Sequence, residues 1–184
     1  METTAEYDST KEKSLPTTWS TVELGDVATL SSGTTPLRSK NDVYFDGGDI
    51  HWVKTKDLTN GNLFETEELV TKQALNETSL SIYREGTVLI AMYGGFNQIG
   101  RTGLLNVPAT VNQAISAIQT DSDRVIPRYL IGYLNYKTDY WKNVAVSSRK
   151  DPNITSRDVG RFPLVLPPLP EQRAIAEALS DVDA

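Results

Sequence analysis

The sequence predicts an α+β fold, with a mixed, twisted and mostly antiparallel β-sheet, short helices and a C-terminal helix. Three observations support this class. Short apolar runs of strand length, such as residues 87–92, are separated by irregular polar loops. Helical periodicity is confined to a few segments, so regular β-α-β units are not expected. A proline-stiffened turn over 167–170 opens a final segment with an apolar stripe at helical spacing.

The first half of the chain is expected to be rich in loops. Its predicted elements are an ordered start at 15–19, a helical turn with an extended piece over 22–30, a long loop over 31–49, a strand at 50–53, a polar turn over 54–61 and a partly helical segment at 65–75. The long loop follows from its glycine, serine, threonine and aspartate content, which favours turns over regular structure.

The second half is expected to hold more regular structure. Its predicted elements are a strand at 87–92, a glycine-rich reversal at 93–101, strands at 102–105 and 114–119, helical pieces at 127–135 and 138–144, a polar loop at 147–153 and a last strand at 162–166. Pro127 is a helix start signal, and Leu130, Ile131 and Leu134 form an apolar stripe after it.

The C-terminal segment has the clearest helix signals. Pro170 suits the first helical turn, where a missing N–H costs nothing, and Glu171 suits the positive helix start. Ile175, Leu179 and Val182 follow at i, i+4 and i+7. No glycine cap or closing turn follows this apolar stripe, which predicts a partner helix or continuation in a longer protein. We expect a flexible leader over 1–14, a folded domain over 15–167 and a helical segment over 168–184.

Composition excludes several classes of protein. The 184 residues are enough for one domain with a sizeable core. The absence of cysteine excludes disulfides and thiolate metal sites, and the single histidine argues against zinc. No apolar run approaches the ~18 residues of a membrane span, and the leader has no apolar core, so we expect no membrane contact and a cytoplasmic location.

Charge is distributed unevenly along the chain. The net charge of −6 argues against a protein that coats nucleic acid by bulk attraction. Residues 1–85 carry a net charge of −7, residues 86–170 carry +4 and residues 171–184 carry −3. A basic middle allows one cationic face, although chance clustering accounts for the charges alone equally well.

Nothing in the sequence indicates an active site. The glycines over 94–100 match neither G-x-G-x-x-G nor the P-loop, which favours a tight turn over a phosphate cradle. His51 lies between apolar residues, so a core or surface role is favoured over a catalytic base. There is no G-x-S-x-G elbow and no carboxylate pair at a suggestive spacing. The segment 151–154 lacks the second proline and the aromatic of the amino-methyltransferase motif, and we interpret it as a turn that starts a strand or a helix. We therefore expect no catalytic and no metal-binding residue.

Polar residues around the reversal suit DNA instead. Asn97 and Gln98 can each read adenine bidentately, Arg101 can read guanine, and glycine lets the backbone approach a groove. Lys54 and Lys56 flank a turn, and the basic loop 147–150 can hold phosphates or base edges. Considered one at a time, the two lysines are also explained as solvated surface residues, and the loop 147–150 as an ordinary basic loop.

Taken in order, these segments resemble one target-recognition domain of a type I restriction–modification specificity subunit, over residues 15–184. The matching segments are Leu15-Pro16 with Trp19, Leu24-Gly25-Asp26-Val27, Gly33-Thr34-Thr35-Pro36, 47–54, Asp57-Leu58 with Gly61, 86–91, Gly100-Arg101, Asn112-Gln113, Tyr129-Leu130 with Tyr133-Leu134, Asn153-Ile154, and 166–172 with Ile175-Ala176. Their shared order and the Pro170-Glu171-Gln172 start of the last helix are the most specific marks.

The resemblance implies a DNA-reading module and not an enzyme. Full subunits of the family carry two such domains, joined by long helices that pair antiparallel, and each domain reads half of a split target. The helices bind methyltransferase subunits, and a restriction and motor subunit joins them. S-adenosylmethionine, ATP and Mg are expected on those partners, and no cofactor is expected on this chain.

The resemblance implies that this chain holds one DNA target-recognition domain, over 15–167, and only the start of one spacer helix, over 168–184. Fifteen helical residues from Pro170 cover about 22 Å, whereas one duplex turn is about 34 Å. We therefore expect a half-subunit or a truncated chain, which could form a homodimer if its spacer helix were complete.

The leading hypothesis places loops 33–40, 54–60, 93–101 and 147–153 on one face that enters or flanks the major groove. The predicted DNA contacts are Thr34, Arg38, Lys40, Lys54, Lys56, Tyr93, Gly94, Asn97, Gln98, Arg101, Ser147, Ser148, Arg149 and Lys150. The alternative is an assembly module that docks methyltransferase subunits through Ile175, Leu179 and Val182, with little DNA reading. A third hypothesis, an enzyme in its own right, predicts methyl transfer or cleavage by the chain, and we expect neither.

Overall fold

The computed structural model describes the backbone of residues 15–146 and 153–182, and the side chains of all of these except 146 and 180–182. Its first elements are β1 (Ser20–Glu23), η1 (Leu24–Asp26), β2 (Ala28–Ser32), η2 (Arg38–Lys40), α1 (Asn41–Tyr44), β3 (Ile50–Val53), η3 (Thr55–Asp57), β4 (Gly61–Leu63), β5 (Glu68–Val70) and α2 (Lys72–Glu77). They are followed by β6 (Val88–Ala91), β7 (Thr102–Leu105), β8 (Ala109–Val111), β9 (Ile115–Thr120), α3 (Pro127–Tyr136), α4 (Thr138–Val146), α5 (Ser156–Gly160), β10 (Pro163–Leu166) and α6 (Leu169–Val182).

The described strands form three sheets. The central sheet has the order β2-β9-β6-β7-β4 and is antiparallel except for the β4–β7 pair. A second sheet, β5-β3-β8, contains a parallel β3–β8 pair, and β1 pairs with β10. The predicted α+β class with mixed, mostly antiparallel pairing is confirmed, with the strands divided among three sheets.

The central strand β6 shows why the middle of the chain folds as it does. All four of its side chains are buried. Val88 and Ile90 pack into the core under α3, whereas Leu89 and Ala91 face a second core shared with β3 and β8. Because successive side chains of a strand point to opposite faces, an unbroken apolar run serves two cores at once.

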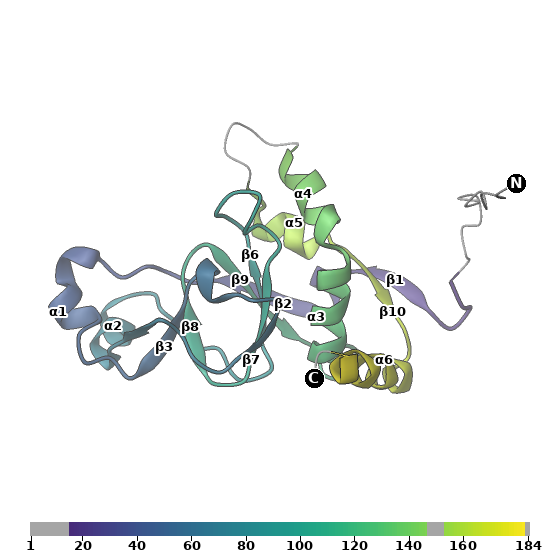
Figure 1. Cartoon of the computed structure of the whole chain (residues 1–184), viewed down its shortest axis with the longest axis horizontal. Coiled ribbons are helices and arrows are strands. Elements are labelled where there is room, and N and C mark those ends of the chain that lie inside the picture. Colours follow the sequence, from purple (N-terminus) through teal and green to yellow (C-terminus); the bar gives the residue numbers. More distant parts are fainter. Residues whose placement is uncertain (1–14, 147–152, 183–184) are drawn as a thin grey trace, which may run out of the picture.

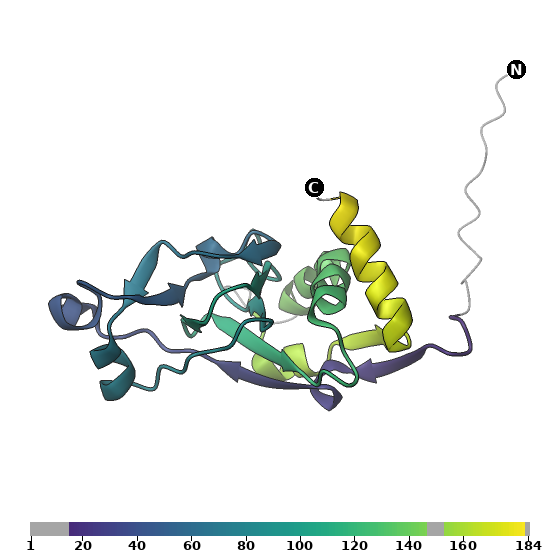
Figure 2. The same cartoon turned by 90° about the horizontal axis from the view of Figure 1, so that it is seen from below.

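The described part is elongated (Figure 1). The sheet β5-β3-β8 lies with α1 and α2 at one end, the central sheet lies in the middle, and α3, α6 and the β1–β10 pair lie at the other end. Figure 2 shows α6 beside α3. Within the described residues, no helix has the length and apolarity that crossing a bilayer requires.

Local expectations for the first half were partly wrong, because the predicted long loop over 31–49 contains η2 and α1. The prediction of a partly helical segment at 65–75 is confirmed by α2, although the strand β5 precedes this helix. The short strands β1, β4 and β8 were not predicted, and the element that follows 151–154, left open as a strand or a helix, is the helix α5. Most of these elements are too short to show periodicity, but α5 carries a signal that was overlooked. Thr155 and Asp158 form a capping box, in which each side chain bonds the other's backbone N–H.

The start of α6 belongs to the main core. Gln172 is fully buried, and its amide accepts from Ile126 N at 2.9 Å and donates to Arg124 O at 2.9 Å and Pro167 O at 2.8 Å. The neighbouring Glu171 carboxylate accepts from the indole of Trp19 at 2.7 Å. These contacts give a physical reason for the Pro170-Glu171-Gln172 sequence. The Gln172 amide hydrogen-bonds the backbone at the start of α3 and after the end of β10, and so fixes the start of α6 against both.

The predicted apolar stripe on α6 divides between core and surface. Ile175 packs against the core, and Leu179 is 45% exposed. The side chain of Val182 lies outside the described residues, as do the predicted leader 1–14 and residues 183–184. The domain boundary at 167 therefore stays a prediction.

Candidate nucleic-acid interface

Four connecting segments meet where β3, β6 and β8 end and β9 begins. Backbone hydrogen bonds join them: Thr34 N donates to Val111 O at 3.1 Å, Asn112 N to Val53 O at 3.0 Å, and Met92 N to Ala114 O at 2.7 Å. We call the surface formed by 33–40, 54–60, 93–101 and 112–114 the loop edge. It gathers three of the four predicted loops, and the fourth, with Ser147, Ser148, Arg149 and Lys150, lies outside the described residues.

The flank of that fourth loop nevertheless meets the loop edge. Ile154 N donates to Met92 O at 3.0 Å, and the hydroxyl of Ser156 lies 3.7 Å from the sulfur of Met92. Ile154 and Ser156 thus lie beside Met92, the residue that precedes the glycine-rich reversal.

The reversal at 93–101 presents exposed polar and aromatic side chains on a constrained backbone. Gly94, Gly95 and Gly100 have positive φ angles of 114°, 79° and 79°. A Cβ at Gly100 would lie 2.8 Å from a ring carbon of the buried Trp141, so only glycine fits there. Asn97 and Arg101 are exposed, and neither side chain has a partner among the described residues. Tyr93 and Phe96 are 39% and 47% exposed.

The turn after β3 lies directly against this reversal. Thr55 Oγ1 donates to Gln98 Oε1 at 2.6 Å. Asn60 N donates to Thr102 O at 2.8 Å, and Asn60 Oδ1 accepts from Thr102 N at 3.0 Å. Lys56 is exposed between these contacts, without an ion pair to any described residue.

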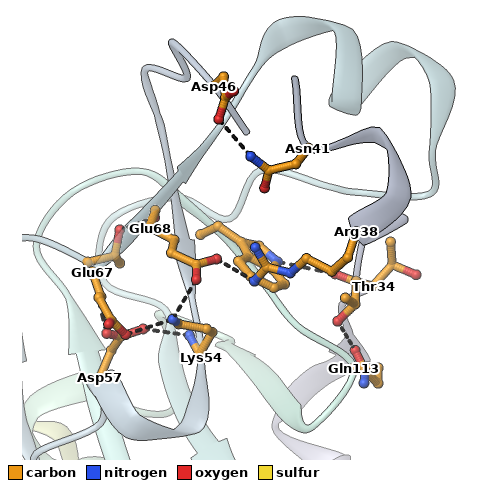
Figure 3. Close-up of polar contacts among 12 residues, drawn as sticks. Thr34, Arg38, Asn41, Asp46, Lys54, Asp57, Glu67, Glu68 and Gln113 are labelled. Carbon is orange, nitrogen blue, oxygen red and sulfur yellow. Dashed lines mark hydrogen bonds and ion pairs between the residues drawn. The ribbon is translucent and has the colours of Figure 1, made fainter. Parts of the chain in front are cut away.

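Arg38 and Lys54 belong to one ion-pair cluster with Glu67 and Glu68, in which the Arg38 side chain stays 48% exposed (Figure 3). Lys54 Nζ lies 2.7 Å from Glu67 and 3.1 Å from Glu68, and its side chain is only 18% exposed. Arg38 pairs with Glu68 as well, and its guanidinium lies 4.1 Å from the centre of the Phe45 ring. The interpretation of Lys54 as a solvated lysine is therefore wrong, and carboxylates neutralise this part of the edge.

Burial and pairing act in opposite directions on these charges. Partial burial opposes ionisation of Glu68, but hydrogen bonds from Arg38 and Lys54 outweigh it and hold the pKa of the Glu68 carboxyl below its ordinary value. Partial burial also works against the charge on Lys54, but hydrogen bonds to Glu67 and Glu68 raise the pKa of its ammonium above the ordinary value.

Replacing Glu68 by glutamine is expected to lower the free energy of unfolding by about 1 kcal/mol at pH 7, because Arg38 and Lys54 lose a charged acceptor. A lowered folded-state pKa stabilises the fold above the unfolded pKa of about 4.3, and that contribution is lost as pH falls through the folded-state value. The unmodified chain should therefore lose more stability than Glu68→Gln on acidification.

Urea unfolding between pH 3 and pH 7 measures both effects. The control is Glu85→Gln, because Glu85 is exposed and forms no ion pair within the described residues. Equal dependence on pH in the unmodified chain and in Glu68→Gln would contradict the role given to this pair.

The remaining predicted contacts are occupied within the fold. Lys40 Nζ lies 3.0 Å from the hydroxyl of Tyr44 and 3.8 Å from Glu77, beside α1 and α2. Thr34 accepts from the indole of Trp52 through its carbonyl at 3.2 Å and from the Ser79 hydroxyl through its own hydroxyl at 3.1 Å. The structure thus brings together six predicted residues: Lys56, Tyr93, Gly94, Asn97, Gln98 and Arg101.

Sequence reasoning missed one polar pair on the same edge. Thr35 Oγ1 donates to Gln113 Oε1 across 78 residues of chain, and Gln113 lies beside the segment that carries Thr34 (Figure 3). Both residues stand in segments that carried the family resemblance, so the signal was present, but nothing local indicated that they pair.

The chemistry available at this edge is hydrogen bonding and charge. His51 lies within β3, with Nδ1 3.1 Å from the hydroxyl of Thr66. Among the described residues, no group of three or more His, Asp or Glu side chains is placed to hold a metal ion.

Comparison with known proteins relates the whole described fold to one family. The model of the family described as "Type I restriction modification DNA specificity domain" matches residues 16–184. The Escherichia coli specificity subunit of the type I restriction enzyme EcoR124I/EcoR124II is 23% identical over 167 residues, which cover 90% of this chain and 40% of that protein.

Two solved structures share the fold. One, from a study of the assembly and conformational transition of a type I R-M system, gives a TM-score of 0.73 at 23% identity and covers 94% of this chain and 40% of that chain. The HsdS subunit from Thermoanaerobacter tengcongensis gives a TM-score of 0.67 at 22% identity and covers 94% and 39%. This chain thus spans about 40% of the length of these three relatives.

Proposed function

This chain belongs to the family of type I restriction modification DNA specificity domains, and from that premise we propose that it reads one half of a split DNA target. One observation carries the proposal at the level of the site. Lys56, Asn97 and Arg101 are exposed on adjoining loops of one edge, without a partner among the described residues. A duplex supplies phosphates for the cations and base edges for the amide.

Electrostatics support a reader that depends on specific contacts. The chain has a net charge of −6, and the carboxylates at Arg38 and Lys54 cancel the cations there. Bulk attraction to phosphate is therefore weak, so affinity depends on a few contacts, and those made to phosphates weaken as the salt concentration rises. Asn97 suits adenine, and Arg101 suits guanine or a phosphate.

Catalysis in this proposal belongs to other polypeptides in the cytoplasm. The chain itself is not an enzyme. Methyl transfer and cleavage come from methyltransferase and restriction subunits, which bind S-adenosylmethionine, ATP and Mg.

The direct test is selection from a randomised duplex library by the purified chain at low salt, followed by sequencing of the bound fraction. Enrichment of one short continuous motif, as expected for half of a split target, supports the proposal. Binding that is equal for all sequences, or methyl transfer or cleavage by the chain alone, counts against it.

Arg101→Ala is expected to weaken binding to the selected motif about tenfold, as removal of a base or phosphate contact does. Fluorescence anisotropy on labelled duplexes measures this. Arg84→Ala is the matched control, because Arg84 is exposed near the start of β6, whereas Arg101 follows its far end. Equal affinities for the two variants would remove Arg101 from the interface.

A second candidate function, docking of methyltransferase subunits by α6 with little DNA reading, is favoured by the exposure of Leu179. Deleting 168–184 does not test it cleanly, because the deletion removes the buried Gln172 and Ala176. Leu179→Asp, assayed by co-purification with a methyltransferase subunit, leaves that core in place.

A further inference from the structure

Two glutamine amides on the loop edge are oriented by threonine hydroxyls. Thr55 Oγ1 donates to Gln98 Oε1, and Thr35 Oγ1 donates to Gln113 Oε1. In each pair the threonine comes from a different loop than the glutamine, 43 and 78 residues away in the chain. Tertiary structure thus builds the same arrangement twice on one edge.

Gln98 is also enclosed on a second side. A Cβ at Gly94 would lie 2.5 Å from Gln98 Oε1 and 2.9 Å from its Cδ, so the backbone of the reversal lies against the amide. The Gln98 amide therefore has two neighbours from different parts of the chain, the Thr55 hydroxyl and the Gly94 backbone.

Both amides keep their donor side available. Neither Nε2 makes a hydrogen bond within the described part of the chain, and neither is among the buried polar atoms that lack a partner there. A glutamine amide carries two donors on Nε2 and its acceptor on Oε1. Pairing with adenine uses both atoms, whereas guanine presents two acceptors, N7 and O6, in the major groove. Oε1 has two lone pairs and the threonine occupies one of them, but that hydrogen bond directs Oε1 at the threonine rather than at a base. The two Nε2 donors are therefore the groups left to meet a base, and they suit guanine.

We propose that Thr55 and Thr35 are positioning residues that hold Gln98 and Gln113 as hydrogen-bond donors toward guanine edges in the target. The inference rests on the proposed function and deepens it, because it replaces the expectation that Gln98 reads adenine bidentately. Met92 N donates to Ala114 O, so the two glutamines emerge from neighbouring reversals and can serve a single half-site.

The test repeats the library selection with valine in place of each threonine, which keeps the side-chain shape and removes the hydroxyl. The unmodified chain is expected to select guanine at the two positions that Gln98 and Gln113 contact. Thr55→Val frees Gln98 Oε1 and should raise the ratio of adenine to guanine about tenfold at the first position. Thr35→Val should do the same at the second.

A double variant separates positioning from a merely structural role. Gln98→Leu should abolish the preference at the first position, and adding Thr55→Val should change nothing further, because the threonine acts only through the glutamine. Thr29→Val is the control, since Thr29 is exposed on β2 and its hydroxyl has no hydrogen bond to a described residue. Its selected motif should match that of the unmodified chain.

An unchanged base preference in both valine variants overturns the proposal. An equal loss of affinity for every sequence in Gln98→Leu and Gln113→Leu also overturns it, since the donors would then contact phosphate oxygens. If the unmodified chain enriches no motif at all, the proposed function itself is overturned. If it enriches a motif that is unchanged in both valine variants, only this inference is rejected.

Discussion

Gly33→Ala is expected to lower the free energy of unfolding by about 3 kcal/mol or more, because the added methyl group has no space. A Cβ at Gly33 would lie 1.7 Å from the carbonyl oxygen of Val111 and 2.7 Å from its Cγ2. Val111 is fully buried, and its carbonyl also accepts from Thr34 N. The backbone at 33–34 must therefore move away from β8, which breaks that hydrogen bond and displaces the loop carrying Thr35.

Urea unfolding at neutral pH measures the loss, and Gly61→Ala is the matched control. Gly61 lies in β4, and a Cβ there would meet nothing within 4 Å. Alanine at that position should be neutral or stabilise by a few tenths of a kcal/mol, because it restricts the unfolded chain. A Gly33→Ala variant as stable as Gly61→Ala would show that the approach of this loop to β8 is not as close as described.

Gln172→Glu is expected to cost about 3 kcal/mol at pH 7, and less at pH 5. The substitution keeps an acceptor for Ile126 N but places a second oxygen against the carbonyls of Arg124 and Pro167, where the amide donated. Burial raises the pKa of the introduced carboxyl, because no cation accompanies it among these partners. The protonated form, stable below that pKa, can donate to one carbonyl, so stability relative to the unmodified chain should fall as pH rises.

Unfolding measured from pH 5 to pH 8 tests both the size and the sign of this effect. Gln119→Glu is the control, because Gln119 is half-buried on β9 and its amide has no hydrogen bond to a described residue. It should show a small change with little dependence on pH. A Gln172→Glu variant that is equally stable at pH 5 and pH 8 would reject the arrangement of hydrogen bonds around this side chain.

Local patterns predicted the long elements well. The apolar run at β6 and the Pro127 start of α3 are both where the sequence analysis placed them. Strand β8, an Ala-Thr-Val segment, was missed because three residues carry too little periodicity to be recognised. It forms because pairing with β3 and burial of all three side chains hold it in place.

The sequence predicted which residue types form the candidate site, but not which of their side chains are free and which are paired within the fold. Residue types around the glycines indicated DNA contacts, and the structure brings Lys56, Asn97 and Arg101 together, which supports the proposal without testing it. Lys54 was a candidate on the same grounds, and its carboxylate partners stand 13 and 14 residues away in sequence. No local pattern shows that those carboxylates turn toward it.

By itself, the sequence determined the family and the fold class, including the apolar run that forms β6 and the glutamine at the start of the last helix. These features depend on residue type and on spacing along the chain, which can be read directly. Only the tertiary structure decided which polar groups are free and which are occupied. The contacts of Arg38 with Glu68 and of Thr55 with Gln98 join residues 30 and 43 positions apart, and such pairings exist only once the strands have packed.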